Sequence, residues 1–242
     1  MSWLGKDKHF LVFPVSQNKT LNVVAFITKP EDQLGNLKES WTSSAPREEL
    51  EKEYEGWDET LIKTIRCMDP YPGKWRLNDR ELLSQWIFMD GKTVLMGDAA
   101  HAMLPHQGTY PSPLTPFPPP SEAYTSSGSG AGHSIEDGYI LGRALKDYFA
   151  ELNDPKSGLA RPLSVWTHVY QKVRLPRTQK AQITSRQAGD VYEMQGPDFQ
   201  GLSYDECLPI VEEKLKHRMK WVWGGDIDAE YERVVRESNL RN

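Results

Sequence analysis

The residues best suited to chemistry lie in two short stretches on either side of a proline-rich segment. The first, residues 93–108, reads TVLMGDAAHAMLPHQG, and the second, residues 130–137, reads GAGHSIED. Asp98 follows an apolar strand, where its carboxylate could accept hydrogen bonds from ribose-like hydroxyl groups. The small residues around it would let a ligand approach the backbone closely, and the amides of 130–135 at a helix N-terminus would face an electron-rich or anionic group. As an isolated residue, Asp98 is more simply explained as a turn or cap carboxylate.

Two apolar strands predict a β-hairpin ahead of these stretches. Residues 9–15 (HFLVFPV) and 21–28 (LNVVAFIT) are rich in β-branched and aromatic residues, and 16–19 supply the turn. Because both strands are almost continuously apolar, we expect both faces of the hairpin to be covered. Further strands are expected at 74–79 and 92–96.

Helices are expected over most of the remaining chain. A short helix with proline and acids in its first turn is predicted to begin in the stretch 44–49, and another should cover 59–68 with Asp58 as its N-cap. A helix capped at Ser134 should follow the second motif stretch. Three later helices are expected, over 163–194 with a kink at Pro176, over 204–216 and over 226–237.

The proline-rich segment 109–129 interrupts the two motif stretches. It holds six prolines in 21 residues, together with many serines and threonines. Such a composition is typical of a solvated, polyproline-like loop. We interpret 109–129 as translated intron sequence, and Met1 as an internal start in a longer reading frame. A natural regulatory loop is the alternative.

Composition limits the classes of function. The chain has 242 residues, is 38% hydrophobic and 26% charged, and carries a net charge of −5. These values indicate a globular protein without a basic face for nucleic acid or anionic lipid. No apolar run is long enough for a membrane span, and charged residues interrupt any signal peptide. Since Cys67 and Cys207 match neither a zinc nor a disulfide pattern, we expect a cytoplasmic or other intracellular protein.

The two motif stretches resemble the second flavin motif of the aromatic-ring monooxygenases of the salicylate hydroxylase group. The resemblance extends to Trp57–Trp86 before the motif, to Val169–Arg186 in the long helix, and to Trp221–Asp226. The residues that carry it in the motif are Gly97, Asp98, Ala99, Ala100, His101, Met103, Pro105, Gly108, Gly130, Ala131, Gly132, Ile135, Glu136 and Asp137. It therefore covers nearly the whole chain except 109–129.

This resemblance implies a cofactor, a substrate class and a set of binding residues. FAD would be bound, with Asp98 on the ribityl or nearby sugar–phosphate region and Pro105 beside the isoalloxazine ring. The small residues Gly97, Ala99 and Ala100 would form the turn, and Gly108 with Gly130, Ala131 and Gly132 would pack around the pyrimidine edge of the ring. In such enzymes NAD(P)H reduces the flavin, and a flavin hydroperoxide formed with dioxygen hydroxylates a small aromatic substrate. His9 would lie in the sheet that lines the substrate pocket.

Two departures from the family pattern bear on activity. The family begins with a strand–GxGxxG–helix unit that holds the ADP half of FAD, and this chain contains no such unit. Gly128–Gly132 is glycine-rich but follows the proline-rich segment and not a strand. The second departure is the segment 109–129, which splits the glycine loop against the flavin. We therefore expect the chain to bind FAD poorly and without full occupancy.

Other interpretations rest on weaker patterns. His101, His106 and His133 with Asp98 could ligate a metal, but their spacing matches no common metal motif, so no metal is expected. His9 is a weak candidate for a catalytic base, because a hydrogen-bonded sheet histidine explains it as well. Arg174 and Arg177 are interpreted as a solvated helix face. A hydrolase would need GxSxG or a catalytic cysteine. The rival from another class is a non-catalytic chain that binds partners through the PxxP pattern at 116–119.

The sequence as a whole predicts a mixed α/β fold containing part of a flavin monooxygenase. Residues 1–87 are expected to form a partial substrate domain with a mixed sheet. Residues 88–160 should carry the GDAAH motif and the FAD-binding portion, and 161–242 a helical region. The predicted function is NAD(P)H-dependent, FAD-dependent hydroxylation of a salicylate-like or related ring.

Overall fold

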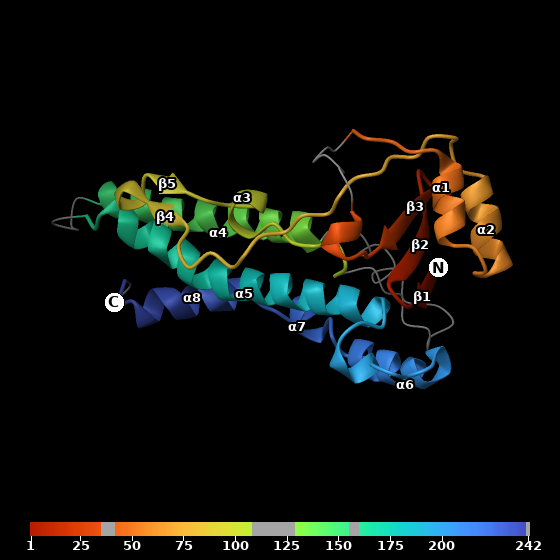
Figure 1. Ribbon diagram of the computed structural model, residues 1–242. Coiled ribbons are helices and arrows are strands. Elements are labelled where there is room, and N and C mark those ends of the chain that lie inside the picture. The colour runs from red at the N-terminus through yellow and green to blue at the C-terminus, as the bar shows by residue number, and fades with distance from the viewer. Residues whose placement is uncertain (35–41, 108–128, 155–159, 241–242) are drawn as a thin grey trace. The chain divides into compact units, whose positions relative to one another are not determined.

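The computed structural model describes residues 1–34, 42–107, 129–154 and 160–240 (Figure 1). Its contacts divide the chain into two compact units that interleave along the sequence. Unit 1 comprises 1–77 with 190–211, and unit 2 comprises 78–189 with 212–242. The division by motif into 1–87, 88–160 and 161–242 stays a prediction.

Unit 1 contains a three-stranded antiparallel sheet. Its strands are β1 (Ser2–Gly5), β2 (Lys8–Val15) and β3 (Thr20–Ile27), in the order β1-β2-β3. The predicted hairpin is confirmed as β2 and β3, with Leu11 opposite Val24. Positive φ angles at 16–18 turn the chain between them. The expected burial is correct for Phe10–Val12 of β2. It is wrong for β3, most of which is half-exposed, because the described residues pack mainly against the middle of β2.

Two helices cover this sheet. They are α1 (Arg47–Glu53) and α2 (Glu59–Arg66). Asp58 accepts hydrogen bonds from the Thr60 and Leu61 amides, which confirms it as the N-cap of α2. The residue before α1 is Pro46, so this helix starts without a side-chain cap. The core of unit 1 is formed by Phe10, Val12, Tyr54, Leu61 and Ile65.

Unit 2 is built mainly from long helices. Its small elements are β4 (Ile87–Phe88), β5 (Thr93–Val94) and α3 (Asp98–His101), and β4 pairs antiparallel with β5. The helices are α4 (Ser129–Leu152), α5 (Leu163–Tyr192), α7 (Lys220–Trp223) and α8 (Ile227–Glu237). Helix α6 (Tyr204–Leu215) and α5 each continue past a boundary between the units. Short 3-10 turns occupy 31–33, 89–91 and 197–199.

The core of unit 2 lies between α4, α5 and α8. Trp86, Ile140, Trp166, Tyr170 and Val235 are among its buried residues. Helices α4 and α5 run side by side in Figure 1, and buried ion pairs described below join them. Within the part of the chain that the structure describes, no helix is both long and apolar enough to cross a membrane.

Three predicted elements differ from the observed ones. The strand expected at 74–79 is wrong: the pairing is limited to an isolated bridge just before it, between Ser44 and Gly73, and the exposed side chains of 74–76 give a strand no face to bury. The strand expected at 92–96 is reduced to the two residues of β5. Helix α4 begins at Ser129 and not at a Ser134 cap, so the glycine-rich stretch 130–132 is helical. The segment 109–129, with its PxxP pattern, lies outside the described residues apart from the backbone of Ser129.

Candidate functional site

A pocket in unit 2 brings the two motif stretches together. Its volume is about 430 Å³, within the range of small-molecule sites. One wall is Asp98 with residues 103–105, and the other is the first turns of α4. The lining residues are Asp98, Met103, Leu104, Pro105, Gly130, Ala131 and Ser134. The pocket therefore contains four residues expected at a cofactor site: Asp98, Pro105, Gly130 and Ala131.

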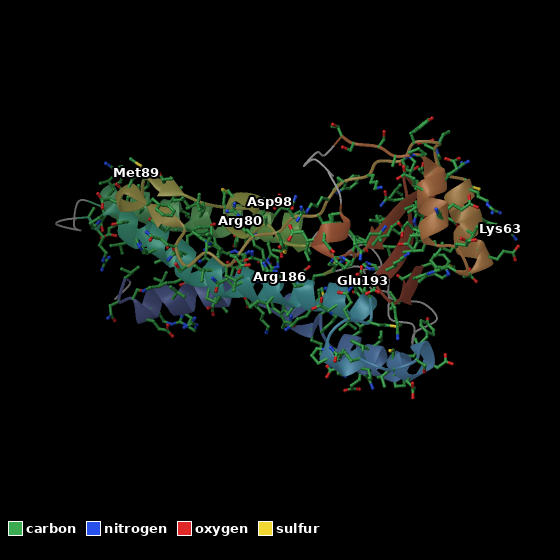
Figure 2. All side chains as sticks on the ribbon, viewed as in Figure 1. Lys63, Arg80, Met89, Asp98, Arg186 and Glu193 are labelled. Carbon is green, nitrogen blue, oxygen red and sulfur yellow. The ribbon has the colours of Figure 1, made fainter. Side chains whose placement is uncertain are left out.

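The turn before Asp98 depends on a glycine. Gly97 has φ 58° and ψ −143°, a conformation that L side chains rarely adopt. A Cβ atom on Gly97 would lie 3.2 Å from the Ser134 hydroxyl, so the turn packs closely on α4. Asp98 then opens the short helix α3 with its side chain exposed, and the Arg80 guanidinium donates a hydrogen bond to the Ala99 carbonyl at 2.5 Å (Figure 2).

The remaining predicted site residues have different positions. Ala99 is exposed on α3, whereas Ala100 is buried in the core of unit 2. Gly132 lies in the first turns of α4 and is exposed. Gly108 lies outside the described residues.

A buried carboxylate, Asp137 on α4, holds both ends of the GDAAH segment. Its Oδ2 accepts a hydrogen bond from the Gly97 amide at 2.8 Å. The same oxygen lies 2.6 Å from His101 Nε2, which must carry the proton because a carboxylate only accepts. Both side chains are completely buried. His101 is therefore a structural hydrogen-bonding residue.

Two arginines of α5 complete this network. The fully buried Arg174 donates from Nε to Asp137 Oδ1 at 2.8 Å and also pairs with Glu136. Arg177 pairs with Glu136 at 2.8 Å and is largely buried. The interpretation of Arg174 and Arg177 as a solvated face is wrong, because the acids of α4 neutralise them inside the unit. A signal was present: Arg174 follows Trp166 and Tyr170 at intervals of four, on the buried stripe of α5.

These contacts determine how Asp137 titrates. Burial alone would raise the pKa of its carboxyl, but the hydrogen bonds from His101, Arg174 and the Gly97 amide hold that pKa below its usual range. The folded state thus binds fewer protons than the unfolded state. The Asp137 carboxylate therefore stabilises the folded state fully above the pKa of an aspartate in the unfolded chain, about 3.9. This stabilisation is lost as the pH falls through the pKa of Asp137 in the folded state.

We expect Asp137→Asn to flatten the acid dependence of stability. Urea unfolding from about pH 5 to about pH 3 should show the free energy of unfolding falling more steeply in the wild type than in the variant. Glu136, whose pKa is also lowered, keeps its contribution in both proteins. Asp228→Asn, at an exposed carboxylate of α8, should keep the wild-type slope. Equal slopes for Asp137→Asn and the wild type would contradict the assignment.

Helix α5 also holds the wall formed by 103–105. Gln182 donates to the Ala102 carbonyl at 3.1 Å, and the Ser185 hydroxyl donates to the Leu104 carbonyl. The Thr184 hydroxyl donates to Gln107 Oε1 at 2.7 Å. The polar residues of α5 thus fix the backbone on one side of the pocket, a role that the sequence pattern alone did not assign.

His9, the weak candidate for a base, lies in unit 1. Its Nδ1 is 2.9 Å from Glu193 Oε1, with both side chains buried, and its ring stacks on Phe26 at 4.2 Å between centroids. The geometry favours a structural histidine in the sheet. Among the described residues, no group of three His, Cys, Asp or Glu side chains is arranged to hold a metal.

Comparison with known proteins identifies relatives of nearly the whole chain. A salicylate hydroxylase of Pseudomonas putida is 33% identical over 234 residues, which are 94% of this chain and 45% of that protein. A dual trans-enoyl reductase/FAD-dependent monooxygenase of Aspergillus terreus is 29% identical over 93% of this chain and 29% of that protein. A solved salicylate hydroxylase substrate complex superposes with a TM-score of 0.73 at 29% identity, covering 97% of this chain and 49% of that one. No protein-family model matches.

The mixed helix-and-sheet fold matches about half of the fold of an FAD-dependent monooxygenase, which confirms the predicted fold class. More particularly, the chain is a homologue of the salicylate hydroxylase group, and the resemblance noted in its motifs is confirmed. The chain spans about half the length of the salicylate hydroxylases that it matches.

Proposed function

We propose that the pocket of unit 2 binds the isoalloxazine ring and ribityl chain of FAD in an NAD(P)H-dependent monooxygenase that hydroxylates a salicylate-like ring. The observation that carries this proposal is the pocket itself, whose opposite walls come from the two motif stretches. The relationship to FAD-dependent monooxygenases supports the choice of cofactor.

The lining residues fit one half of FAD. Met103, Leu104 and Pro105 offer an apolar surface to a flat ring. The Asp98 carboxylate can accept hydrogen bonds from the hydroxyl groups of a ribityl chain. Among the described lining residues Asp98 is the one charged side chain, and it is negative, so the pocket favours a neutral ring and polyol over a pyrophosphate.

The residues of the chain have separate tasks in this function. Asp98 orients the ribityl chain, and the 103–105 wall excludes water from one side of the ring. The first turns of α4, through Gly130, Ala131 and Ser134, form the opposite side of the site. FAD, when bound, supplies the oxygen chemistry, with NAD(P)H as reductant and dioxygen as co-substrate.

Titration with flavins tests the proposed site. We expect the purified protein to lack stoichiometric flavin. We also expect it to bind riboflavin and FAD with similar affinity, because none of the described lining residues is a cation that could bind the phosphates. Flavin fluorescence quenching measures both dissociation constants. Asp98→Ala should raise them about tenfold through loss of charge-assisted hydrogen bonds, whereas Asp228→Asn should leave them unchanged. Absence of binding by either flavin would overturn the proposed site.

A second experiment tests the proposed monooxygenase activity. The segment 109–129 is deleted and a strand–GxGxxG–helix unit is placed ahead of the chain. We expect this protein to oxidise NADH or NADPH faster when salicylate or a related phenol is present. If flavin binds but no phenol in a broad panel stimulates oxidation, the monooxygenase assignment is contradicted while the flavin site stands.

A further inference from the structure

We propose that the buried Asp137–Arg174 ion pair is a positioning device that fixes the two walls of the pocket relative to each other and thereby sets its affinity for flavin. The consequence for affinity rests on the proposed flavin site. Neither residue lines the pocket, so both would act through the backbone that they hold.

The first wall is held through Asp137. Its Oδ2 binds the amide of Gly97, the residue next to Asp98, and also the His101 ring at the other end of α3. One oxygen thus contacts both ends of the segment 97–101, whose backbone is also closed by the bond from the His101 amide to the Gly97 carbonyl at 2.9 Å. Because glycine loses more backbone freedom on ordering than any other residue, the Asp137 contact favours the one conformation of Gly97 that the turn uses.

The second wall is held through Arg174. Its guanidinium donates to the His133 carbonyl at 3.1 Å and pairs with Glu136, both in the first part of α4. His133 adjoins Ser134, which lines the pocket. Since Arg174 also binds Asp137 Oδ1 at 2.8 Å, a single guanidinium joins the contacts of both walls.

The chain offers a matched control for this ion pair elsewhere in unit 2. Arg143 of α4 also pairs with two carboxylates, Asp228 and Glu232 of α8, but none of these residues lines the pocket. Arg174→Lys and Arg143→Lys are the same substitution in two ion pairs of similar composition. Asp137→Asn and Asp228→Asn form a second matched pair.

The experiment uses two measurements on the full chain. Hydrogen exchange of the flavin-free protein reports the backbone of 97–101, and riboflavin titration reports affinity. We expect Arg174→Lys and Asp137→Asn to accelerate exchange at 97–101 and to raise the riboflavin dissociation constant about tenfold, as for loss of a buried charge-assisted hydrogen bond. Arg143→Lys and Asp228→Asn should leave both measurements at wild-type values. Because Arg174→Lys retains the positive charge beside Asp137, this variant still tests the inference if Asp137→Asn does not fold.

The outcomes separate this inference from the proposed function. If Arg174→Lys lowers the melting temperature while exchange at 97–101 and riboflavin affinity stay at wild-type values, the ion pair is structural only and the inference is wrong. If exchange rises as expected but the wild type binds no riboflavin, the positioning of the turn is supported and the flavin site is contradicted. Equal changes in the Arg174 and Arg143 variants would also overturn the inference.

Discussion

Gly91→Ala is expected to lower the free energy of unfolding by about 3–5 kcal/mol. Gly91 lies between β4 and β5 with φ +86°, in the region that favours glycine. A Cβ atom there would lie 2.6 Å from Ser164 Cα and 2.7 Å from Ser164 N. Because these are backbone atoms at the start of α5, they cannot move aside as a flexible side chain would, so backbone strain and a steric clash act together.

Gly56→Ala separates these two effects. Gly56 has a similar φ of +81°, but among the described residues, its chain neighbours aside, no atom lies within 4 Å of the position of its added Cβ. We expect this variant to lose only the strain contribution, about 1 kcal/mol. Urea unfolding curves of both variants and the wild type measure the difference. Equal losses would mean that the approach to Ser164 contributes nothing.

Arg174→Met is expected to lower the free energy of unfolding by about 3–5 kcal/mol, because it leaves the buried Asp137 carboxylate without its cation. The methionine fills part of the space of the arginine, so the loss of charge dominates the effect. Asp137 would retain only the Gly97 amide and His101. Thermal and urea unfolding measure this loss.

Two further variants test the cause of that loss. Arg233→Met removes a cation that pairs with Glu230 and Glu237 on the exposed face of α8, and it should have little effect. The double variant Asp137→Asn/Arg174→Met should be less destabilised than the sum of the two single variants, since the unpaired charge is then absent. Strict additivity would show that Arg174 and Asp137 do not act as a pair.

The sequence predicts the local elements of the fold better than the contacts between them. The hairpin and the Asp58 cap follow from short-range preferences, namely β-branched residues and a carboxylate before a helix. The strand expected at 74–79 fails because a strand needs a partner and a face to bury, and neither is recorded in six residues of sequence. The predicted start of α4 at Ser134 is wrong because the buried residues Ile140 and Ala144, further along the helix, stabilise it enough for the glycine-rich stretch 130–132 to join its first turns.

In the candidate site, too, the sequence predicts local motifs better than contacts between distant residues. Asp98, Pro105, Gly130 and Ala131 line one pocket although 109–129 separates them in sequence, and their role in binding FAD stays a prediction. Arg174 was misassigned despite its place on the buried stripe of α5, because the partners that make its burial tolerable come from α4. Whether a charged residue is solvated or buried depends on such distant neighbours, which periodicity does not identify.

The Asp137 contacts also have a kinetic consequence. The bond to Gly97 joins residues 40 apart in sequence, and the bond to Arg174 joins residues 37 apart. Closing loops of this length costs chain entropy before any contact repays it. We therefore expect the turn at Gly97 to reach its native geometry only after α4 and α5 have paired, so that the pocket forms late in folding although the GDAAH residues are contiguous in the chain.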